Sequence, residues 1–218
     1  MQDSSAHGAS RASFTSAFTP LLALSAAVLT ASALTACAGP DRIAKTTIRG
    51  SGVVANDFEA SVSGLGYSGD IDTDYKSIEL GIGATYFETG SNIDDEPGRK
   101  LSRAELLIGK AEFEDVDAIE ISGGGRYFFG SHPKFQPFLS VHTVGTYFEE
   151  VDDFELGIQL GLRAGAGVEF ALSESFFLDA GIDYNIPLIA AESDAVLGQS
   201  IDTEVSGWAV RIGLGFMF

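Results

Sequence analysis

The sequence predicts an all-β fold, an eight-stranded antiparallel up-and-down transmembrane β-barrel. The stretch Trp208–Phe218 has a large apolar residue at every second position and small or charged residues between them, which is the alternation of a β-strand with one apolar face. Similar runs recur at even spacing from Asn56 onward, separated by clusters of Gly, Asp, Ser and Pro. The clearest runs oppose an apolar face to a face of glycine and charge, as expected where one face meets lipid and the other lines a narrow lumen.

Composition limits the possible functions. At 218 residues the chain has room for one domain and an export segment. Its 26 glycines and only 2 methionines favour strands over long helices. A net charge of −18 with only 13 Lys and Arg argues against nucleic acid as a partner and favours cations or basic peptides. The single cysteine excludes an intramolecular disulfide and a cysteine-cluster metal site.

The first residues have the pattern of an export signal. A polar segment leads into the apolar run Leu21–Leu34, which is too short for a stable membrane anchor. The following Leu34-Thr35-Ala36-Cys37 resembles the lipobox of bacterial lipoproteins. This resemblance implies a lipoprotein-type signal peptide over residues 1–36 and lipidation of Cys37. The alternative is ordinary signal cleavage after Ala38, because Ala36-Cys37-Ala38 is also an A-x-A-like site.

Residues 37–55 are mixed in composition and are predicted to be a periplasmic tether, which assigns the barrel to residues 56–218. Eight alternating runs fall in that barrel segment: 57–67, 75–87, 103–113, 118–129, 136–148, 154–171, 176–188 and 207–218. If both termini are periplasmic, short inside turns should alternate with longer outside loops. Glu88–Ser102 should be an inside turn yet is long, which leaves the strand register of residues 56–113 open.

The apolar faces are expected to meet lipid. Those of the runs at 75–87, 154–171 and 176–188 carry no charge, as expected if a charge at mid-membrane costs about 2–4 kcal/mol. Aromatic residues near the ends of the runs are expected to form two interfacial belts. They are Tyr67, Tyr75, Tyr86, Phe87, Tyr127, Phe129, Tyr147, Phe148, Phe176, Tyr184, Trp208 and Phe218.

The opposite faces place charged residues in the predicted lumen. These are Glu59, Glu79, Glu120, Arg126, Arg163, Glu169, Asp179, Asp183 and Arg211. Buried charges must be paired and hydrogen-bonded, and eight strands leave an interior only wide enough for side chains. The set therefore predicts a salt-bridged network that plugs the lumen. The alternative is a gated, narrow path whose acidic excess would favour cations.

No catalytic residue, cofactor or protein metal site is predicted. The segment Asp70–Asp74 has the D-x-D-x-D spacing of a calcium loop, but Tyr75 and Gly81 stand where that loop needs Gly and a bidentate Glu. His142 shares a predicted lumen face with Ser140, yet spacing identifies no third, orienting acid, so a structural histidine is expected. Acidic clusters in predicted outside loops could attract divalent cations that bridge to the phosphates of surface lipid. Their members are Glu112, Glu114, Asp115, Asp117, Glu149, Glu150, Asp152 and Asp153.

A closing strand that ends on Phe218 looks like that of bacterial outer-membrane barrels. Over residues 56–218 the pattern resembles the small barrels of the OmpA, OmpX and OmpW type. The resemblance implies a monomer in the outer membrane of a diderm bacterium, surrounded by outer-membrane lipid, with a periplasmic N-terminus. It also implies that the barrel-assembly machinery recognises the closing strand, with Trp208, Phe216 and Phe218 as the signal.

Barrels of this type are known as structural or adhesive proteins, as narrow channels and, less often, as enzymes. The charged lumen, the acidic loops and the missing catalytic set favour a structural or surface-interaction barrel. A narrow, cation-preferring, porin-like channel is the alternative. A soluble lipocalin-like periplasmic barrel and a lipid-modifying enzyme are the least favoured, because glycine-plus-charge faces do not suit a water-facing surface and no family motif of such enzymes is present.

Overall fold

The computed structural model describes residues 42–64, 67–88, 99–114, 116–130, 132, 134–149, 157–194 and 200–218. The expected signal peptide of residues 1–36 and the expected lipidation site Cys37 lie outside these residues. Within the described residues, no helix is long and apolar enough to cross a membrane.

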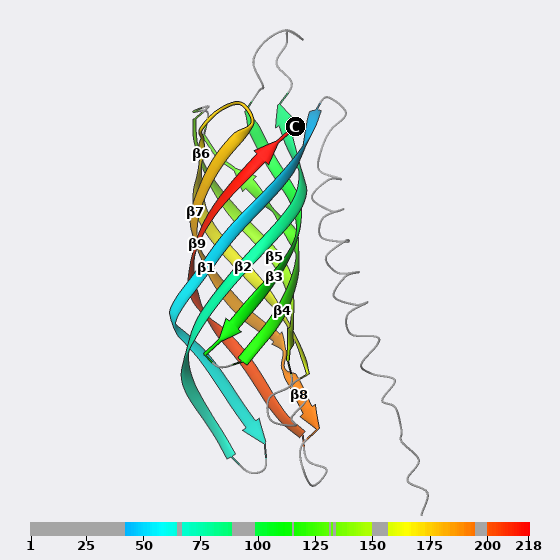
Figure 1. The fold of residues 1–218 in the computed structure, drawn as a ribbon, viewed down its shortest axis with the longest axis vertical. Coiled ribbons are helices and arrows are strands. Elements are labelled where there is room, and N and C mark those ends of the chain that lie inside the picture. The colour runs from blue at the N-terminus through cyan, green and yellow to red at the C-terminus, as the bar shows by residue number, and fades with distance from the viewer. Residues whose placement is uncertain are drawn as a thin grey trace, which may run out of the picture.

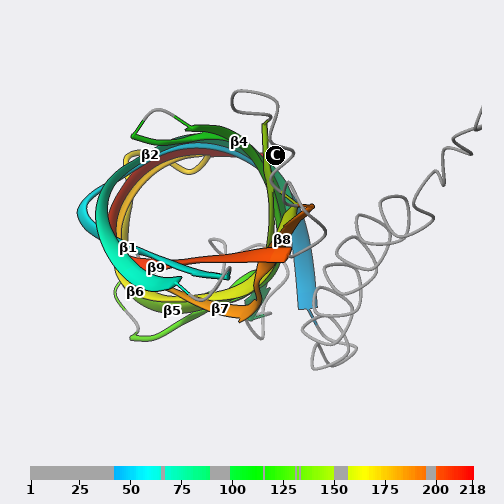
Figure 2. The same cartoon turned by 90° about the horizontal axis from the view of Figure 1, so that it is seen from below.

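One antiparallel sheet closes on itself to form a barrel (Figures 1 and 2). Its strands are β1 (Arg42–Gly64), β2 (Tyr67–Glu88), β3 (Lys100–Phe113), β4 (Val116–Phe128), β5 (Phe135–Phe148), β6 (Ile158–Ala171), β7 (Phe176–Ile189), β8 (Ala191–Asp194) and β9 (Ser200–Met217). Each strand up to β7 pairs with the next, and β9 pairs with both β7 and β1. The short β8 continues the line of β7 along β9. The predicted eight-stranded antiparallel barrel is confirmed.

The barrel starts earlier than the sequence suggests. Strand β1 begins at Arg42 and pairs with β2 from there, so the expected tether over residues 37–55 is wrong from Arg42 onward. Thr47, Arg49 and Ser51 face the lumen here, while Gly50 and Gly52 lie on the outer face. This mixture hides the strand because neither face is apolar enough to produce a clear alternation.

A β-bulge in β1 changes which side chains face inward. The register of β1 shifts between the lumen-facing residues Ala55 and Phe58 against β2, and between Val54 and Phe58 against β9. An extra residue in one strand reverses the inward–outward parity beyond it. Phe58 is therefore buried and Glu59 is exposed, so the prediction that Glu59 faces the lumen is wrong.

Both ends of the described chain lie at one end of the barrel. In Figure 1, β1 starts beside the C-terminal residue Phe218 at the upper end, and the backbone N–H and C=O groups of Phe218 bond to those of Thr46. We call this the terminal end and the opposite one the far end. At the far end β1 and β2 extend past the end of β3 (Figure 1). Strand β2 ends and β3 begins at the terminal end, which agrees with the expectation of an inside connection between these two strands.

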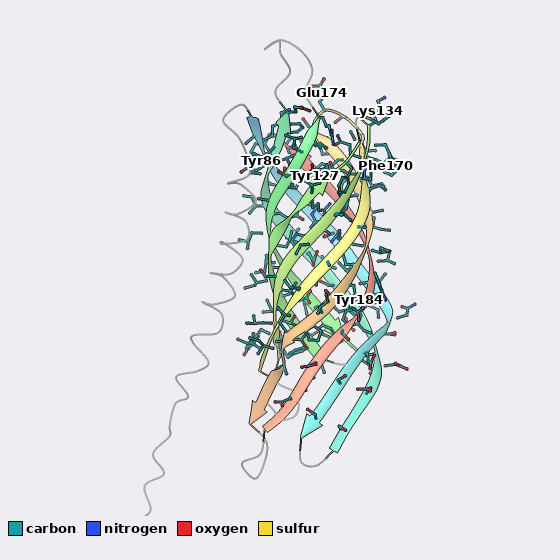
Figure 3. The ribbon with its side chains drawn as sticks, turned by 180° about the vertical axis from the view of Figure 1, so that it is seen from behind. Tyr86, Tyr127, Lys134, Phe170, Glu174 and Tyr184 are labelled. Carbon is teal, nitrogen blue, oxygen red and sulfur yellow. The ribbon has the colours of Figure 1, made fainter. Side chains whose placement is uncertain are left out.

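The outer surface of the barrel wall is apolar. No charged residue lies on the outward faces of β5, β6, β7 and the last part of β9, residues 208–218. Figure 3 shows Tyr86, Tyr127 and Phe170 toward the terminal end, and Tyr184 toward the far end, where it packs on Trp208 with 4.8 Å between ring centroids. The eleven residues from Trp208 to Phe218 span about 33 Å of strand, or about 25 Å of height at a tilt of about 40°. This height matches the apolar band of outer-membrane barrels.

Candidate functional site

The lumen contains six carboxylates and six Lys or Arg side chains that are at most 6% exposed. The carboxylates are Glu79, Glu105, Glu120, Glu169, Asp179 and Asp183, and the cations are Arg49, Lys100, Arg103, Arg126, Arg163 and Arg211. Equal numbers make this part of the described lumen formally neutral. The expected acidic excess in the lumen is therefore not found.

Glu105 of β3 is one of two acidic centres in the middle layer of the lumen. Its Oε1 accepts a hydrogen bond from Arg126 Nε at 2.9 Å and lies 3.0 Å from Nε2 of the buried His142. The Arg49 guanidinium lies 3.4 Å from both oxygens of Glu105. One carboxylate thus joins β1, β3, β4 and β5 across the interior.

Asp179 of β7 is the second centre of this middle layer. Its Oδ1 lies 3.0 Å from Arg126 Nη1 and 3.6 Å from the guanidinium groups of Arg49 and Arg211. Arg211 in turn donates from Nη1 to Asp183 Oδ2 at 2.6 Å. Because Arg49 and Arg126 contact both acidic centres, the middle layer is one continuous network.

A second layer lies nearer the far end and is centred on Arg163 of β6. Arg163 pairs with Glu79, and its Nη2 donates to Glu120 at 2.9 Å and to the Tyr75 hydroxyl at 3.1 Å. The same hydroxyl donates to Glu120 at 2.7 Å, and Arg163 Nε donates to Asn185 at 2.9 Å. Tyr75 is fully buried in this layer, so its expected place in an interfacial belt is wrong.

A third layer lies nearer the terminal end. Glu169 of β6 pairs with Lys100, and its Oε2 lies 2.8 Å from Arg103 Nη1. Arg103 also donates from Nε to Thr85 at 2.8 Å, and its guanidinium lies 4.3 Å from the ring centroid of Phe177. Both cations of this layer are thereby held against aromatic faces as well as against a carboxylate.

Aromatic side chains close the lumen on either side of these layers. At the far end the rings of Phe58, Tyr75, Phe113 and Phe148 pack in a row, with neighbouring centroids 4.8, 4.9 and 5.4 Å apart. At the terminal end Phe87, Phe177 and Met217 form a second buried cluster. The described lumen is therefore filled along its length by ion pairs between two apolar lids.

Glycine makes room for this filling. A Cβ atom added to Gly165 would lie 1.9 Å from Asp183 Oδ1, and one added to Gly213 would lie 2.6 Å from Asp179 Oδ2. These contacts explain the glycine-plus-charge faces in the sequence, because a glycine opposite a long or charged side chain leaves it the space to cross the lumen.

The structure places eight of the nine predicted lumen charges in these layers, and Glu59 outside them. Four further lumen charges were missed: Arg49, Lys100, Arg103 and Glu105. Arg103 and Glu105 lie two positions apart at the start of the predicted run 103–113. The alternation of inward and outward residues in that run could have identified them. The other two lie before or at the edge of the predicted strands. Trp208, Phe216 and Phe218 lie on the outward face of β9.

His142 lies deep in the network rather than in an open site. It is 1% exposed and Ser140 is 3% exposed. Glu105 supplies the acid beside His142 that spacing could not identify, because it comes from β3 and not from the neighbouring sequence. The ion-pair layers on either side leave these residues enclosed, which suits a structural role.

The wall contains one irregular seam. Pairing of β7 with β9 ends at Asn185 opposite Gly207, and pairing of β8 with β9 starts at Ala191 opposite Thr203. Between them the Val205 backbone bonds to the side chain of Gln159, which donates to the carbonyl at 3.0 Å and accepts from the N–H at 2.9 Å. Gln159 thus replaces a missing strand partner. A small pocket lies beside this bridge.

The far end is acidic. Its exposed carboxylates are Glu59, Asp70, Asp72, Asp74, Glu112, Glu114, Glu149 and Glu204, and Lys110 pairs with the half-buried Asp117 at 2.6 Å. Asp70, Asp72 and Asp74 lie in β2 rather than in a loop. Among the described residues, no three His, Cys, Asp or Glu side chains converge as a metal site. Asp115, Glu150, Asp152 and Asp153 lie outside the described residues.

The chain is similar in sequence to two known bacterial proteins. No protein-family model matches the chain. It is 28% identical over 106 residues to outer membrane protein W of Vibrio cholerae, covering 43% of this chain and 49% of that protein. It is 23% identical over 130 residues to Protein opa of Haemophilus influenzae, covering 56% of this chain and 99% of that protein. The chain thus spans about half the length of outer membrane protein W and nearly all of Protein opa.

Solved structures show the same fold. The outer membrane protein OprG from Pseudomonas aeruginosa superimposes with a TM-score of 0.53 at 17% identity, over 81% of this chain and 97% of that one. The outer membrane protein AlkL in lipid bilayers superimposes with a TM-score of 0.50 at 14% identity, over 83% and 93%. With its closed barrel, apolar outer wall and filled lumen, the chain is an eight-stranded β-barrel with the fold of the small outer-membrane barrel proteins.

Proposed function

We propose that the protein is a closed, non-conducting barrel in the outer membrane of a diderm bacterium, which acts through its outside surface and not through its lumen. The terminal end lies in the periplasm and the far end outside the cell. The apolar band and the fold shared with outer-membrane proteins support the location. The acidic far end supports a surface role, because it concentrates charge where partners outside the cell would meet it.

The observation that carries this proposal is the neutral, salt-bridged lumen. An ion crossing it would have to pass three layers of buried pairs and the two apolar lids. Removing one partner of a buried pair typically costs about 3–5 kcal/mol. Opening a continuous path would disturb several pairs at once, so the closed state is strongly favoured.

Planar-bilayer recording of the purified barrel tests the proposal. Folding is first verified by the mobility difference between unheated and boiled samples on a gel. We expect no current steps above those of the lipid alone over a range of voltages. Reproducible cation-selective steps would replace this proposal with the narrow-channel alternative.

Lipidation at Cys37 is a separate part of the proposal. The lipobox-like Leu34-Thr35-Ala36-Cys37 supports it. Mass spectrometry of the protein isolated from membranes should find acyl chains on an N-terminal Cys37, and a Cys37→Ala variant should lack them. A mature N-terminus after Ala38 would establish ordinary signal cleavage instead.

A further inference from the structure

The far end carries a sheet edge that is paired on one side only. Strand β2 pairs with β1 along its whole length, but its pairing with β3 starts at Tyr75 opposite Phe113. The stretch Tyr67–Asp74 therefore projects beyond β3 (Figure 1). On the other side of β2 the sheet continues at this height, because β1 pairs with β9 and β9 pairs with β8. Within the described part of the chain, no strand pairs with the outer edge of residues 68–72.

The backbone groups on this edge can be assigned from one hydrogen bond. The Asp74 carbonyl accepts from the N–H of Glu114, just beyond β3, at 2.9 Å, so the backbone groups of Asp74 point away from β1. Backbone direction alternates along a strand, and both groups of one residue point to the same side. The N–H and C=O groups of Asp70 and Asp72 therefore point to the open edge, while those of Gly69 and Ile71 point to β1.

The two faces of the projecting sheet differ in chemistry. Asp70 and Asp72 are exposed on one face, and Glu59 lies directly opposite Asp72 on the same face. The other face carries Ile71, which is 54% exposed and lies opposite Ala60. A strand added at this edge would place alternate side chains beside carboxylates and beside an apolar surface.

We propose that this edge of β2 captures an extended segment of a cationic partner protein in which basic and apolar residues alternate. The added strand is antiparallel, with basic residues opposite Asp70 and Asp72 and an apolar residue opposite Ile71. A second copy of this chain is disfavoured, because edge-to-edge pairing would bring the aspartates of both copies together. The inference rests on the proposed surface role, which exposes the far end to such a partner.

The test uses the purified, folded barrel in detergent and a labelled seven-residue peptide, Lys-Val-Lys-Val-Lys-Val-Lys, with both ends blocked. Two control peptides carry backbone N-methyl groups, one on the lysines and one on the valines. In the antiparallel register the lysine N–H groups face β2, whereas the valine N–H groups face away. Methylated lysines should weaken binding by more than about tenfold, whereas methylated valines should leave it nearly unchanged.

Matched variants separate backbone pairing from charge. Asp72→Asn and Asp72→Pro remove the same charge, but only proline removes the edge N–H, at a position where it breaks no bond to β1. We expect Asp72→Pro to bind the peptide about 3- to 10-fold more weakly than Asp72→Asn. Glu174→Asn, which removes one exposed charge at the terminal end, should bind like the unsubstituted protein.

Amide hydrogen exchange gives a second readout. Peptide binding should slow exchange at Asp70 and Asp72 and leave the already bonded Gly69 and Ile71 unchanged. Equal binding of the two methylated peptides, equal binding by the two Asp72 variants, or no binding by the folded barrel would overturn the proposal. Conductance plays no part in these measurements, so a failure here is distinguishable from an open lumen.

Discussion

Arg103 of β3 and Arg126 of β4 lie directly opposite each other in the barrel, two buried arginines on neighbouring strands. Like charges in directly opposite positions destabilise a sheet. Here each arginine has its own carboxylate, Glu169 at 2.8 Å from Arg103 and Glu105 at 2.9 Å from Arg126. Neutralisation by Glu169 of β6, across the lumen, and by Glu105 of β3 itself is what allows this register.

Removing Glu169 should therefore be strongly destabilising. Glu169→Gln leaves Lys100 and Arg103 without their carboxylate and next to Arg126, and we expect a loss of about 3–5 kcal/mol in the free energy of unfolding. Trp208 is the only tryptophan and faces outward, so its fluorescence during urea titration in lipid vesicles reports unfolding. The double variant Glu169→Gln/Arg103→Met should recover part of the loss. An unchanged midpoint for Glu169→Gln would show that the pair contributes nothing to stability.

Two glycines on the neighbouring strands β1 and β9 allow a comparison of a crowded site with an open one. A Cβ atom on Gly213 would lie 2.6 Å from Asp179 Oδ2 and 3.2 Å from the Gly50 carbonyl, whereas one on Gly52 would meet nothing within 4 Å. We expect Gly213→Ala to cost about 1–3 kcal/mol by overpacking. Gly52→Ala should be neutral or stabilise by up to about 1 kcal/mol. The same urea titration compares them, and equal effects would mean that the lumen adjusts freely around Asp179.

Loss of the hydrogen bonds between Gln159 and Val205 should weaken the barrel wall locally, at the seam beside β9. Gln159→Leu leaves both Val205 backbone groups without the side-chain partner, at a cost of about 1–3 kcal/mol for each group left unsatisfied. Gln159→Glu retains the acceptor for the Val205 N–H but lacks the donor for the carbonyl, so its effect should be smaller. Hydrogen exchange at Val205 should accelerate in Gln159→Leu more than in Gln159→Glu. Unchanged protection in both variants would show that the bridge does not hold the seam.

The sequence was sufficient for the fold and for most of the lumen, because period-two alternation identifies both faces wherever one face is strongly apolar. It failed in β1, where small and polar residues such as Thr46, Gly50 and Gly52 replace the apolar stripe of the outer face. The parity error at Glu59 follows from a bulge, which leaves no residue signature in one sequence. Partners such as Glu105 and His142 are 37 positions apart in the sequence and lie on different strands. Their contact depends on the register of the strands between them, which alternation does not give.

Divalent cations should matter if the acidic far end binds surface lipid. The proposal is that exposed carboxylates such as Glu112 and Glu149 bind these cations, which bridge to lipid phosphates. Calcium should then raise the unfolding temperature in vesicles containing phosphate-rich surface lipid more than in neutral vesicles, and EDTA should reverse the rise. The double variant Glu112→Gln/Glu149→Gln should respond less. A calcium response that is absent, or equal in both lipids, would rule out bridging.

Phe218 offers a test that separates stability from assembly. The residue is 61% exposed, and its ring centroid lies 5.7 Å from that of Phe216. Its backbone groups bond to those of Thr46. Phe218→Ser keeps those backbone bonds and removes mainly a lipid-facing side chain, so refolding into vesicles in vitro should change little. If the assembly machinery reads this side chain, the yield of folded protein in the cell should fall by several-fold. Phe170→Ser, which removes an exposed aromatic of the same end from β6, is the control. A normal cellular yield for Phe218→Ser, or an equal loss for both variants, would show that Phe218 is not a recognition signal.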